Sequence, residues 1–254
     1  MTFNIRFEND SDGLNGWSYR RKLVTQIIDK YSPSILGTQE GKRSQLSYLK
    51  ETLPAYEIHI PDRITDDVSQ CPTLFIKRNE FEVLEGKEQW LSKTPHVHLS
   101  KDWDSAFPRM MSYAKLCEKK SGIHLWVAVT HLDHIGVEAR YNQAKIIADW
   151  SKCRNEPVIV MGDFNDNPGS PVHEVLTAPE TILRDTWQIL KRKENRDSFT
   201  NHGFDGIPKK TRMDWILASS HFHVTDAVII RDSMAGRYPS DHFPYMANGE
   251  LQED

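Results

Sequence analysis

Hydrophobic residues follow two different spacings in alternate parts of this chain. Apolar residues three or four positions apart, the spacing of an amphipathic helix, occur in residues 17–31, 45–53 and 138–152. Strand-like runs of β-branched and apolar residues occupy 2–7, 34–39, 111–118, 123–130, 157–162, 212–219 and 222–231, with several extended pieces within 56–90. The alternation predicts a protein that mixes helices and strands.

In two places, only a short turn separates one predicted strand from the next. We therefore expect 111–118 to pair with 123–130, and 212–219 to pair with 222–231. The polar region 62–72 is expected to be a surface loop. Because no repeat, low-complexity tract or linker divides the chain, we predict one α/β (α+β) domain over 1–254. The hairpin-like neighbours favour a sandwich of packed sheets over a parallel barrel.

Polar side chains capable of chemistry lie in, just after or near six of the strands that the sequence predicts. They are Asn4, Glu40, His131 with Asp133, Asp163 with Asn165, Asp214, and Asp241 with His242. Any one of them alone is typical of a turn or a helix cap. Unpaired charges are costly beside apolar strands, so six such positions together predict convergence on one another and on a cation.

The types of these residues suit magnesium or manganese and attack by water on phosphorus. Glu40, Asp241 and Asn4 offer the hard oxygen ligands that these ions prefer. Zinc is disfavoured because the chain has no HExxH and no cysteine partner for a histidine ligand. Asp163 and Asn165, two positions apart, are expected on the same side of an extended segment, as a base and a hydrogen-bond donor.

Six short motifs in order resemble those of the endonuclease/exonuclease/phosphatase superfamily of metal-dependent phosphohydrolases. They are Thr-Phe-Asn-Ile-Arg (2–6), Gly-Thr-Gln-Glu (37–40), Thr-His-Leu-Asp-His (130–134), Gly-Asp-Phe-Asn (162–165), Arg-Met-Asp-Trp-Ile (212–216) and Ser-Asp-His-Phe-Pro (240–244). The resemblance implies a four-layer, deoxyribonuclease-like sandwich of two packed mixed sheets flanked by helices. The active site is then expected at one rim.

The resemblance also implies a role for each matched residue. Glu40 resembles the principal ligand of Mg²⁺ or Mn²⁺, supported by Asn4 and Asp241. Asp163 resembles the residue that activates water, and Asn165 the one that contacts phosphate.

The histidines and an arginine complete the implied site. His242 resembles the imidazole that binds a phosphoryl oxygen, oriented by Asp214, and His131 a phosphate contact or general acid. Arg109 resembles a phosphate-gripping arginine of some members, with a surface ion pair as the alternative. Gln70 stands where close relatives tend to carry Glu, and a neutral side chain cannot stabilise a protonated His131.

Other positions separate this chain from the nucleases of the superfamily. Arg6 stands where many nucleases carry Asp. Residues 12–17 and 90–95 resemble a bacterial branch, which does not by itself identify the substrate. Arg140 and Gln143 are expected to brace the loop after His131.

Composition narrows the substrate and the setting. With 32 basic and 36 acidic residues the net charge is −4, which disfavours a long nucleic acid and favours a phosphorylated small molecule or a short nucleic acid. Three dispersed cysteines, no secretory signal and no apolar run of about 20 residues predict a cytoplasmic protein that does not use a membrane, and we expect a monomer.

Two other functions compete with a metal-dependent phosphoesterase. A catalytically silent module that binds a phosphate ligand on the same fold would be expected to have lost site residues. A serine hydrolase using Ser240 would need a Gly-x-Ser-x-Gly elbow, which the sequence around Ser240 lacks.

Overall fold

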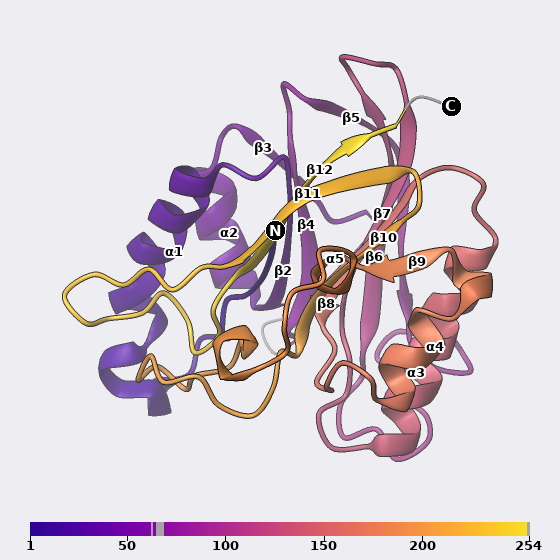
Figure 1. The fold of residues 1–254 in the computed structure, drawn as a ribbon. Helices are drawn as coiled ribbons and strands as arrows, with labels where there is room; N and C mark the ends of the chain where they lie inside the picture. The colour runs from indigo at the N-terminus through magenta and orange to yellow at the C-terminus, as the bar shows by residue number, and fades with distance from the viewer. Residues whose placement is uncertain (62, 65–68, 253–254) are drawn as a thin grey trace.

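Two six-stranded sheets packed face to face form the centre of the molecule, and helices cover their outer faces. The computed structural model describes residues 1–61, 63–64 and 69–252. Helices α1 (Trp17–Tyr31) and α2 (Arg43–Thr52) cover one sheet, whereas α3 (Val137–Lys152) and α4 (Pro171–Leu176) cover the other (Figure 1). The four-layer sandwich expected from the sequence is therefore confirmed.

The first sheet contains both the first and the last strand of the described chain. Its strands, in spatial order, are β11 (Phe222–Ile229), β12 (Tyr245–Leu251), β1 (Thr2–Asn4), β2 (Ile35–Gly41), β4 (Cys71–Lys77) and β3 (Tyr56–His59). Only β1 and β2 run parallel, so the sheet is mixed.

The second sheet contains the middle of the chain. Its strands, in spatial order, are β5 (Phe81–Trp90), β6 (Met110–Glu118), β7 (His124–His131), β8 (Val158–Asp163), β10 (Asp214–Ser219) and β9 (Leu183–Asp185). Here β7 and β8 are the parallel pair. The remaining elements are short: α5 (Thr186–Ile189) and the 3-10 turns η1 (Asp10–Asn15), η2 (Pro179–Thr181) and η3 (Arg196–Ser198).

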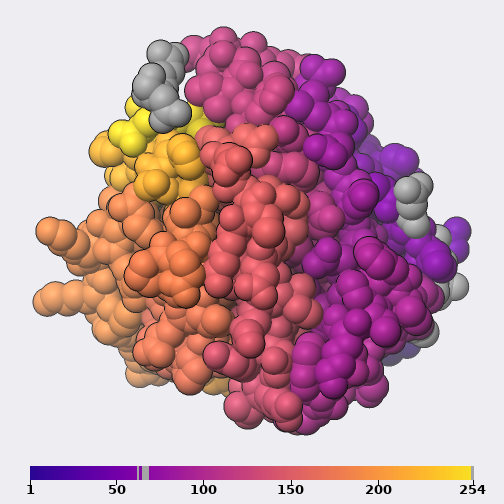
Figure 2. Space-filling view, turned by 90° about the vertical axis from the view of Figure 1, so that its right-hand side faces the viewer, coloured from indigo at the N-terminus to yellow at the C-terminus, as the bar shows by residue number. Residues whose placement is uncertain are grey.

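Three apolar clusters hold the four layers together. One lies between the sheets and includes Leu74, Val127 and Met161. A second joins α1 and α2 to the first sheet, and a third joins α3 and α4 to the second. Seen from the side of α3 and α4, segments from distant parts of the chain lie next to one another on the surface (Figure 2).

The three predicted helices and the pairing of β6 with β7 are confirmed, but the pairing of 212–219 with 222–231 is wrong. β10 is already bonded on one edge to β8 and on the other to β9. No edge is left for β11, which crosses to the first sheet and pairs with β12. A short turn between two apolar runs therefore joins two sheets here instead of forming a hairpin.

The loop predicted over 62–72 falls partly outside the described residues, which exclude 62 and 65–68. At its end the prediction is wrong, because β4 already begins at Cys71, which pairs with Gly41 of β2. Within the described parts of the chain, no helix combines the length and apolar character needed to cross a membrane.

Candidate active site

Strand register brings three of the predicted residues to one edge of the second sheet. His131 ends β7, Asp163 ends β8 and Asp214 begins β10. Asp163 is the direct partner of His131 on one side and of Asp214 on the other. The three side chains are buried, so the sequence prediction that strand ends converge is correct for this sheet.

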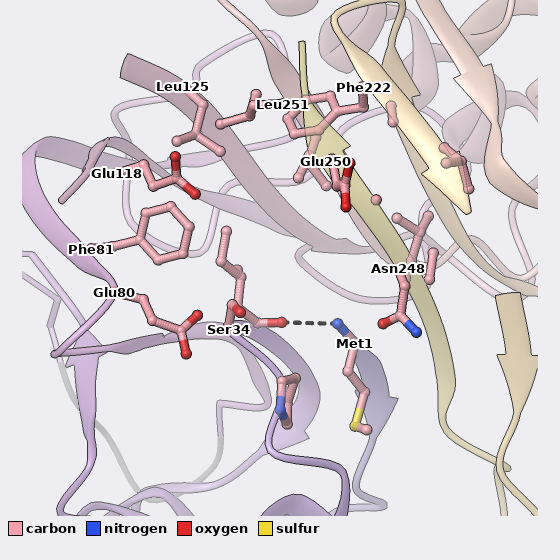
Figure 3. A pocket seen from close by; sticks show the side chains of 18 of the residues that line it. Met1, Ser34, Glu80, Phe81, Glu118, Leu125, Phe222, Asn248, Glu250 and Leu251 are labelled. Carbon is pink, nitrogen blue, oxygen red and sulfur yellow. Dashed lines mark hydrogen bonds between the residues drawn. The ribbon is translucent and has the colours of Figure 1, made fainter. Parts of the chain in front are cut away.

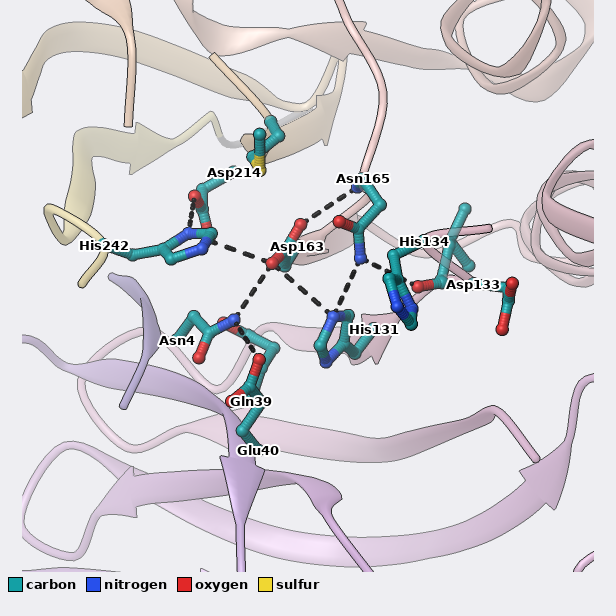
Figure 4. A network of polar contacts seen from close by, with 12 residues as sticks. Asn4, Gln39, Glu40, His131, Asp133, His134, Asp163, Asn165, Asp214 and His242 are labelled. Carbon is teal, nitrogen blue, oxygen red and sulfur yellow. Dashed lines mark hydrogen bonds and ion pairs between the residues drawn. The ribbon is translucent and has the colours of Figure 1, made fainter. Parts of the chain in front are cut away.

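The first sheet contributes the other half of the cluster. Asn4 ends β1, and its amide nitrogen lies 3.0 Å from both Glu40 Oε1 and Asp163 Oδ2. One amide thus links a carboxylate of the first sheet to a carboxylate of the second. His242, from the loop before β12, places Nδ1 at 3.8 Å from Asp163 Oδ2 (Figure 4).

Asp214 and His242 form a buried hydrogen-bonded pair. His242 Nδ1 lies 2.8 Å from Asp214 Oδ2. Burial alone would lower the pKa of His242, but the charge and hydrogen bond of Asp214 raise it to about 10. The imidazole is therefore protonated at neutral pH, and its Nε2–H is left as a charged donor.

Asp163 is the most central carboxyl group of the cluster. It is 1% exposed, and burial followed by the negative charge of Asp214 raises its pKa to about 7. Asn4 and the backbone N–H of Asn165, 2.9 Å from Oδ1, favour the ionised form in part. A carboxyl with a pKa near neutrality is suited to take up a proton.

His131 is neutral in this arrangement. Its Nε2 lies 2.9 Å from Asn165 Nδ2 and therefore acts as the acceptor, which places the proton on Nδ1. Burial, and then the positive charge of Arg109, hold its pKa well below the usual value even though Asp163 Oδ2 lies 3.5 Å away. Nδ1 has no hydrogen-bond partner among the described residues, so Gln70 does not supply one.

The prediction of an extended segment from Asp163 to Asn165 is wrong. β8 ends at Asp163, and Asn165 adopts a left-handed backbone with φ 51°. The turn aims the Asn165 amide at His131 and at the carbonyl oxygen of Leu132, 3.0 Å away. Two more site residues, Arg6 (φ 54°) and Glu40 (φ 65°), have the same uncommon backbone, which is typical of functional sites.

The three predicted metal ligands differ in burial: Asn4 is buried, whereas Glu40 and Asp241 are partly exposed. Glu40 sits at a register shift in β2 and is partly exposed. From the described residues it accepts one hydrogen bond on each oxygen, from Asn4 and from the Phe7 N–H. Asp241 Oδ1 lies 3.2 Å from Ser240 Oγ, whose proton is directed to the nearer carbonyl oxygen of Asn4. The negative charges of Asp241 and Glu40 both help to raise the pKa of Arg6. Such an oxygen-rich set, with lone pairs still free, fits Mg²⁺ or Mn²⁺.

A second group of possible ligand atoms fits a metal less well. Asp163, Asp214 and His242 offer one ligand atom each within 4.8 Å of one another. In this group His242 Nδ1 and Asp214 Oδ2 are already hydrogen-bonded to each other at 2.8 Å. The sequence prediction of Glu40, Asn4 and Asp241 as metal ligands stays a prediction.

The side chains of Asn4 and Asn165 make hydrogen bonds to other protein groups, whereas the sequence predicts contacts with a metal ion and with phosphate. Asn4 donates to two carboxylates, and its amide oxygen accepts the Arg6 N–H at 3.0 Å. Both contacts from Asn165 Nδ2 go to protein acceptors. Their proposed contacts with metal and phosphate stay predictions.

The loop after His131 is braced as the sequence suggests. Gln143 accepts the Asp133 N–H at 2.9 Å, and Arg140 donates to the Asp133 carbonyl oxygen at 2.8 Å. Arg109 is buried beside this loop, with Nε 3.6 Å from Asp133 Oδ2, so the alternative of a surface ion pair is wrong. The charges of Asp163 and Glu40 reach Arg109 as well.

Two positioning contacts have no signal in the sequence. Arg20 of α1, 2% exposed, donates to the carbonyl oxygens of Asn15 (2.9 Å), Arg6 (2.5 Å), Pro239 (3.0 Å) and Ile5. Ser240 Oγ donates to the carbonyl oxygen of Asn4 at 2.6 Å. Both join the end of β1 or the loop after it to the loop before β12, more than 200 positions away. No local pattern in the sequence predicts such contacts.

A cavity of about 720 Å³ between the sheets lies away from this cluster (Figure 3). Its lining is both apolar and acidic, with Phe81, Leu125, Phe222, Glu80 and Glu118 among the residues that form it. None of the predicted catalytic or metal residues lines this cavity.

Comparisons with known proteins agree with the geometry. The profile of the Endonuclease/Exonuclease/phosphatase family matches residues 1–242. A Bacteroides vulgatus endonuclease/exonuclease/phosphatase shares 30% identity over 99% of this chain and 97% of that one, with a TM-score of 0.89. A Bacteroides thetaiotaomicron mannosyl-6-phosphatase shares 28% identity over 98% of both chains, with a TM-score of 0.87.

More distant structures share the fold. TDP2 from D. rerio, solved with a single-strand DNA product, is 20% identical over 98% of this chain and 97% of that one, with a TM-score of 0.79. A search of curated proteins found no match.

Proposed function

Because the chain belongs to the Endonuclease/Exonuclease/phosphatase family, we propose that it is a Mg²⁺- or Mn²⁺-dependent phosphoesterase that hydrolyses a phosphomonoester or phosphodiester. One observation carries the proposal: Asp163, with its pKa raised to about 7, lies between the Asp214–His242 pair, His131 and Asn4. The proposed base, Asp163, and the charged donor, His242, therefore lie next to each other.

In the proposed mechanism a water molecule attacks phosphorus and gives its proton to Asp163 Oδ2. His242 Nε2–H donates to a phosphoryl oxygen and stabilises its growing charge, while Asp214 keeps the imidazole protonated. Asn165 holds the neutral His131 ring in place. The bond from phosphorus to the leaving oxygen breaks, and that oxygen takes a proton from solvent.

Glu40, Asn4 and Asp241 would hold the metal ion. The bound ion supplies positive charge that stabilises phosphoryl oxygens in the transition state. Arg109, buried and within reach of the charges of Asp163 and Glu40, is assigned to the phosphoryl group.

We further propose that residues 1–254 act as one cytoplasmic, monomeric catalytic domain on a small phosphorylated molecule. The net charge of −4 and the 28% identical mannosyl-6-phosphatase support a sugar phosphate over a long nucleic acid.

The test is hydrolysis of bis-p-nitrophenyl phosphate and of mannose 6-phosphate, with Mg²⁺ and with EDTA. We expect turnover that EDTA abolishes and Mg²⁺ restores. Turnover that EDTA does not change would refute the metal dependence. The absence of turnover on both substrates would favour the catalytically silent binding module.

A further inference from the structure

Phe107 and His134 form a flat surface beside the catalytic cluster, and nothing in the proposed chemistry uses it. Their rings are stacked, with centroids 5.7 Å apart and planes 20° from parallel. Phe107 is 54% exposed and His134 is also exposed. The rings come from different segments, one before β6 and one after β7.

A buried carboxylate fixes this surface. Asp133, 0% exposed, accepts the N–H groups of Ala106 and Phe107 on Oδ2, both at 3.1 Å. Its other oxygen accepts the N–H groups of Ile135 (3.0 Å) and Gly136 (2.7 Å). One side chain thus ties together the segments on both sides of the stack. The surface is preformed through the backbone and does not depend on attraction between the rings.

The position of His134 places the stack at the rim of the site. Figure 4 shows its ring on the side of the cluster that holds Asn165 and His131, and His134 is close enough to His131 to act on its pKa. Arg109 Nη2 lies 3.2 Å from His134 Nδ1, and Arg109 lies 5.9 Å from the Phe107 ring. A substrate whose phosphoryl group meets His131 and Arg109 would extend over these rings.

The hydrogen bonding of His134 defines what it can offer a ligand. Because Arg109 is always a donor, His134 Nδ1 must accept, and its proton sits on Nε2. The ring therefore presents a neutral N–H donor next to an aromatic face. The positive C–H edges of a pyranose fit the negative face of Phe107, and its hydroxyl oxygens fit the N–H donor.

We propose that Phe107 and His134 form the subsite for the non-phosphoryl part of the substrate, and that this part is a sugar ring. Asp133 is the positioning residue of this subsite. The proposal rests on the proposed function, because it assigns the neighbouring cluster to the phosphoryl group.

The experiment compares two substrates that differ in the ring. The ratio kcat/KM is measured for mannose 6-phosphate and for glycerol 3-phosphate with the wild type, Phe107→Ala and Phe107→Tyr. Phe107→Ala keeps the backbone contacts to Asp133 and Ser105, so the loop is expected to stay folded. Tyr19→Ala, which removes an exposed aromatic ring on α1, is the matched control.

We expect Phe107→Ala to lower kcat/KM for mannose 6-phosphate about tenfold and to leave glycerol 3-phosphate unchanged. Phe107→Tyr and Tyr19→Ala should behave as the wild type. An equal loss on both substrates, or no loss on either, would overturn the subsite. A larger loss on adenosine monophosphate than on mannose 6-phosphate would overturn the choice of a sugar.

Calorimetric binding of mannose 6-phosphate to the wild type and Phe107→Ala separates this inference from the proposed function. If neither substrate is hydrolysed, the phosphoesterase proposal fails, yet about tenfold weaker binding by Phe107→Ala would still support the subsite. The subsite is overturned if the wild type does not bind mannose 6-phosphate, or if Phe107→Ala binds it as tightly as the wild type.

Discussion

Asp163 and Asp214 are direct partners on neighbouring strands, yet the protein gives them different surroundings. Asp214 Oδ2 has an imidazolium 2.8 Å away, whereas Asp163 lies 3.8 Å from that ring and its pKa is raised by burial and by the charge of Asp214. Two carboxyl groups whose environments differ in this way divide the work of acid–base chemistry. One residue orients a charged donor while the other takes up the proton.

Asp163→Asn tests this division directly. We expect turnover of bis-p-nitrophenyl phosphate to fall by about 10²- to 10⁴-fold, the usual contribution of a general base. The unfolding temperature at pH 8 in EDTA should not fall, because a buried carboxylate whose pKa is raised is destabilising when ionised. Asp226→Asn, an exposed change on β11, serves as the control. Turnover close to wild type would remove Asp163 as the base.

The buried carboxylate of Asp133 should make the stability of the fold depend on pH. Burial would raise its pKa, but four backbone N–H groups lower it to about 2, from 3.8. A carboxyl with a lowered pKa stabilises the fold fully above pH 4, and the contribution disappears as the pH falls toward 2. Its size at pH 7 is about 2 kcal/mol.

We therefore expect Asp133→Asn to lower the free energy of unfolding in urea by about 2 kcal/mol at pH 7 and by about half as much at pH 3. Asp149→Asn, a mostly exposed change on α3, should show no such pH dependence. A difference that stays constant from pH 7 to pH 3 would contradict the assignment.

At the scale of elements, the sequence predicts what is local and misses what depends on crossing between sheets. The helix over 17–31 and the polar ends of β7 and β8 follow from spacing within a few residues. The pairing of β10 could not be predicted, because it depends on β9 occupying its second edge. The turn at Asn165 was missed because its left-handed backbone depends on contacts with Asp163 and His131.

Arg20 also makes contacts that depend on distant segments. Through this residue, α1 holds in place two loops that carry site residues. Its four carbonyl acceptors include Arg6, next to the Asn4 side of the site, and Pro239, next to Asp241. Arg20→Met leaves these buried acceptors without a donor. We expect a loss of about 3 kcal/mol in the free energy of unfolding and a drop in kcat larger than the change in KM.

Two further variants separate position from charge. Arg21→Met removes an exposed arginine from the next position of α1 and should change neither quantity. Arg20→Lys, which reaches fewer carbonyls, should recover part of both losses. If Arg21→Met and Arg20→Met behave alike in kcat and in the free energy of unfolding, the contacts of Arg20 have no role in placing the site.

At the scale of the whole molecule, the site forms where one edge of each sheet meets the other. Asn4 and Glu40 come from the first sheet, and His131, Asp163 and Asp214 from the second. A single hydrogen bond from Asn4 to Asp163 joins the central carboxylate to the proposed metal ligands. An ion bound at Glu40, Asn4 and Asp241 would stabilise the folded molecule, because the unfolded chain does not assemble that set of oxygens.

Mg²⁺ should therefore raise the unfolding temperature even without substrate. At a concentration 100 times its dissociation constant, a ligand specific for the folded state adds about 2.7 kcal/mol, and a chain of this size should gain about 5 °C or more. Glu40→Gln replaces a carboxylate with a neutral amide of the same shape, so it should remove most of the gain. Glu180→Gln, an exposed change in η2, should keep it. Calorimetric melting with Mg²⁺ and with EDTA measures both, and an undiminished gain in Glu40→Gln would place the ion elsewhere in the fold.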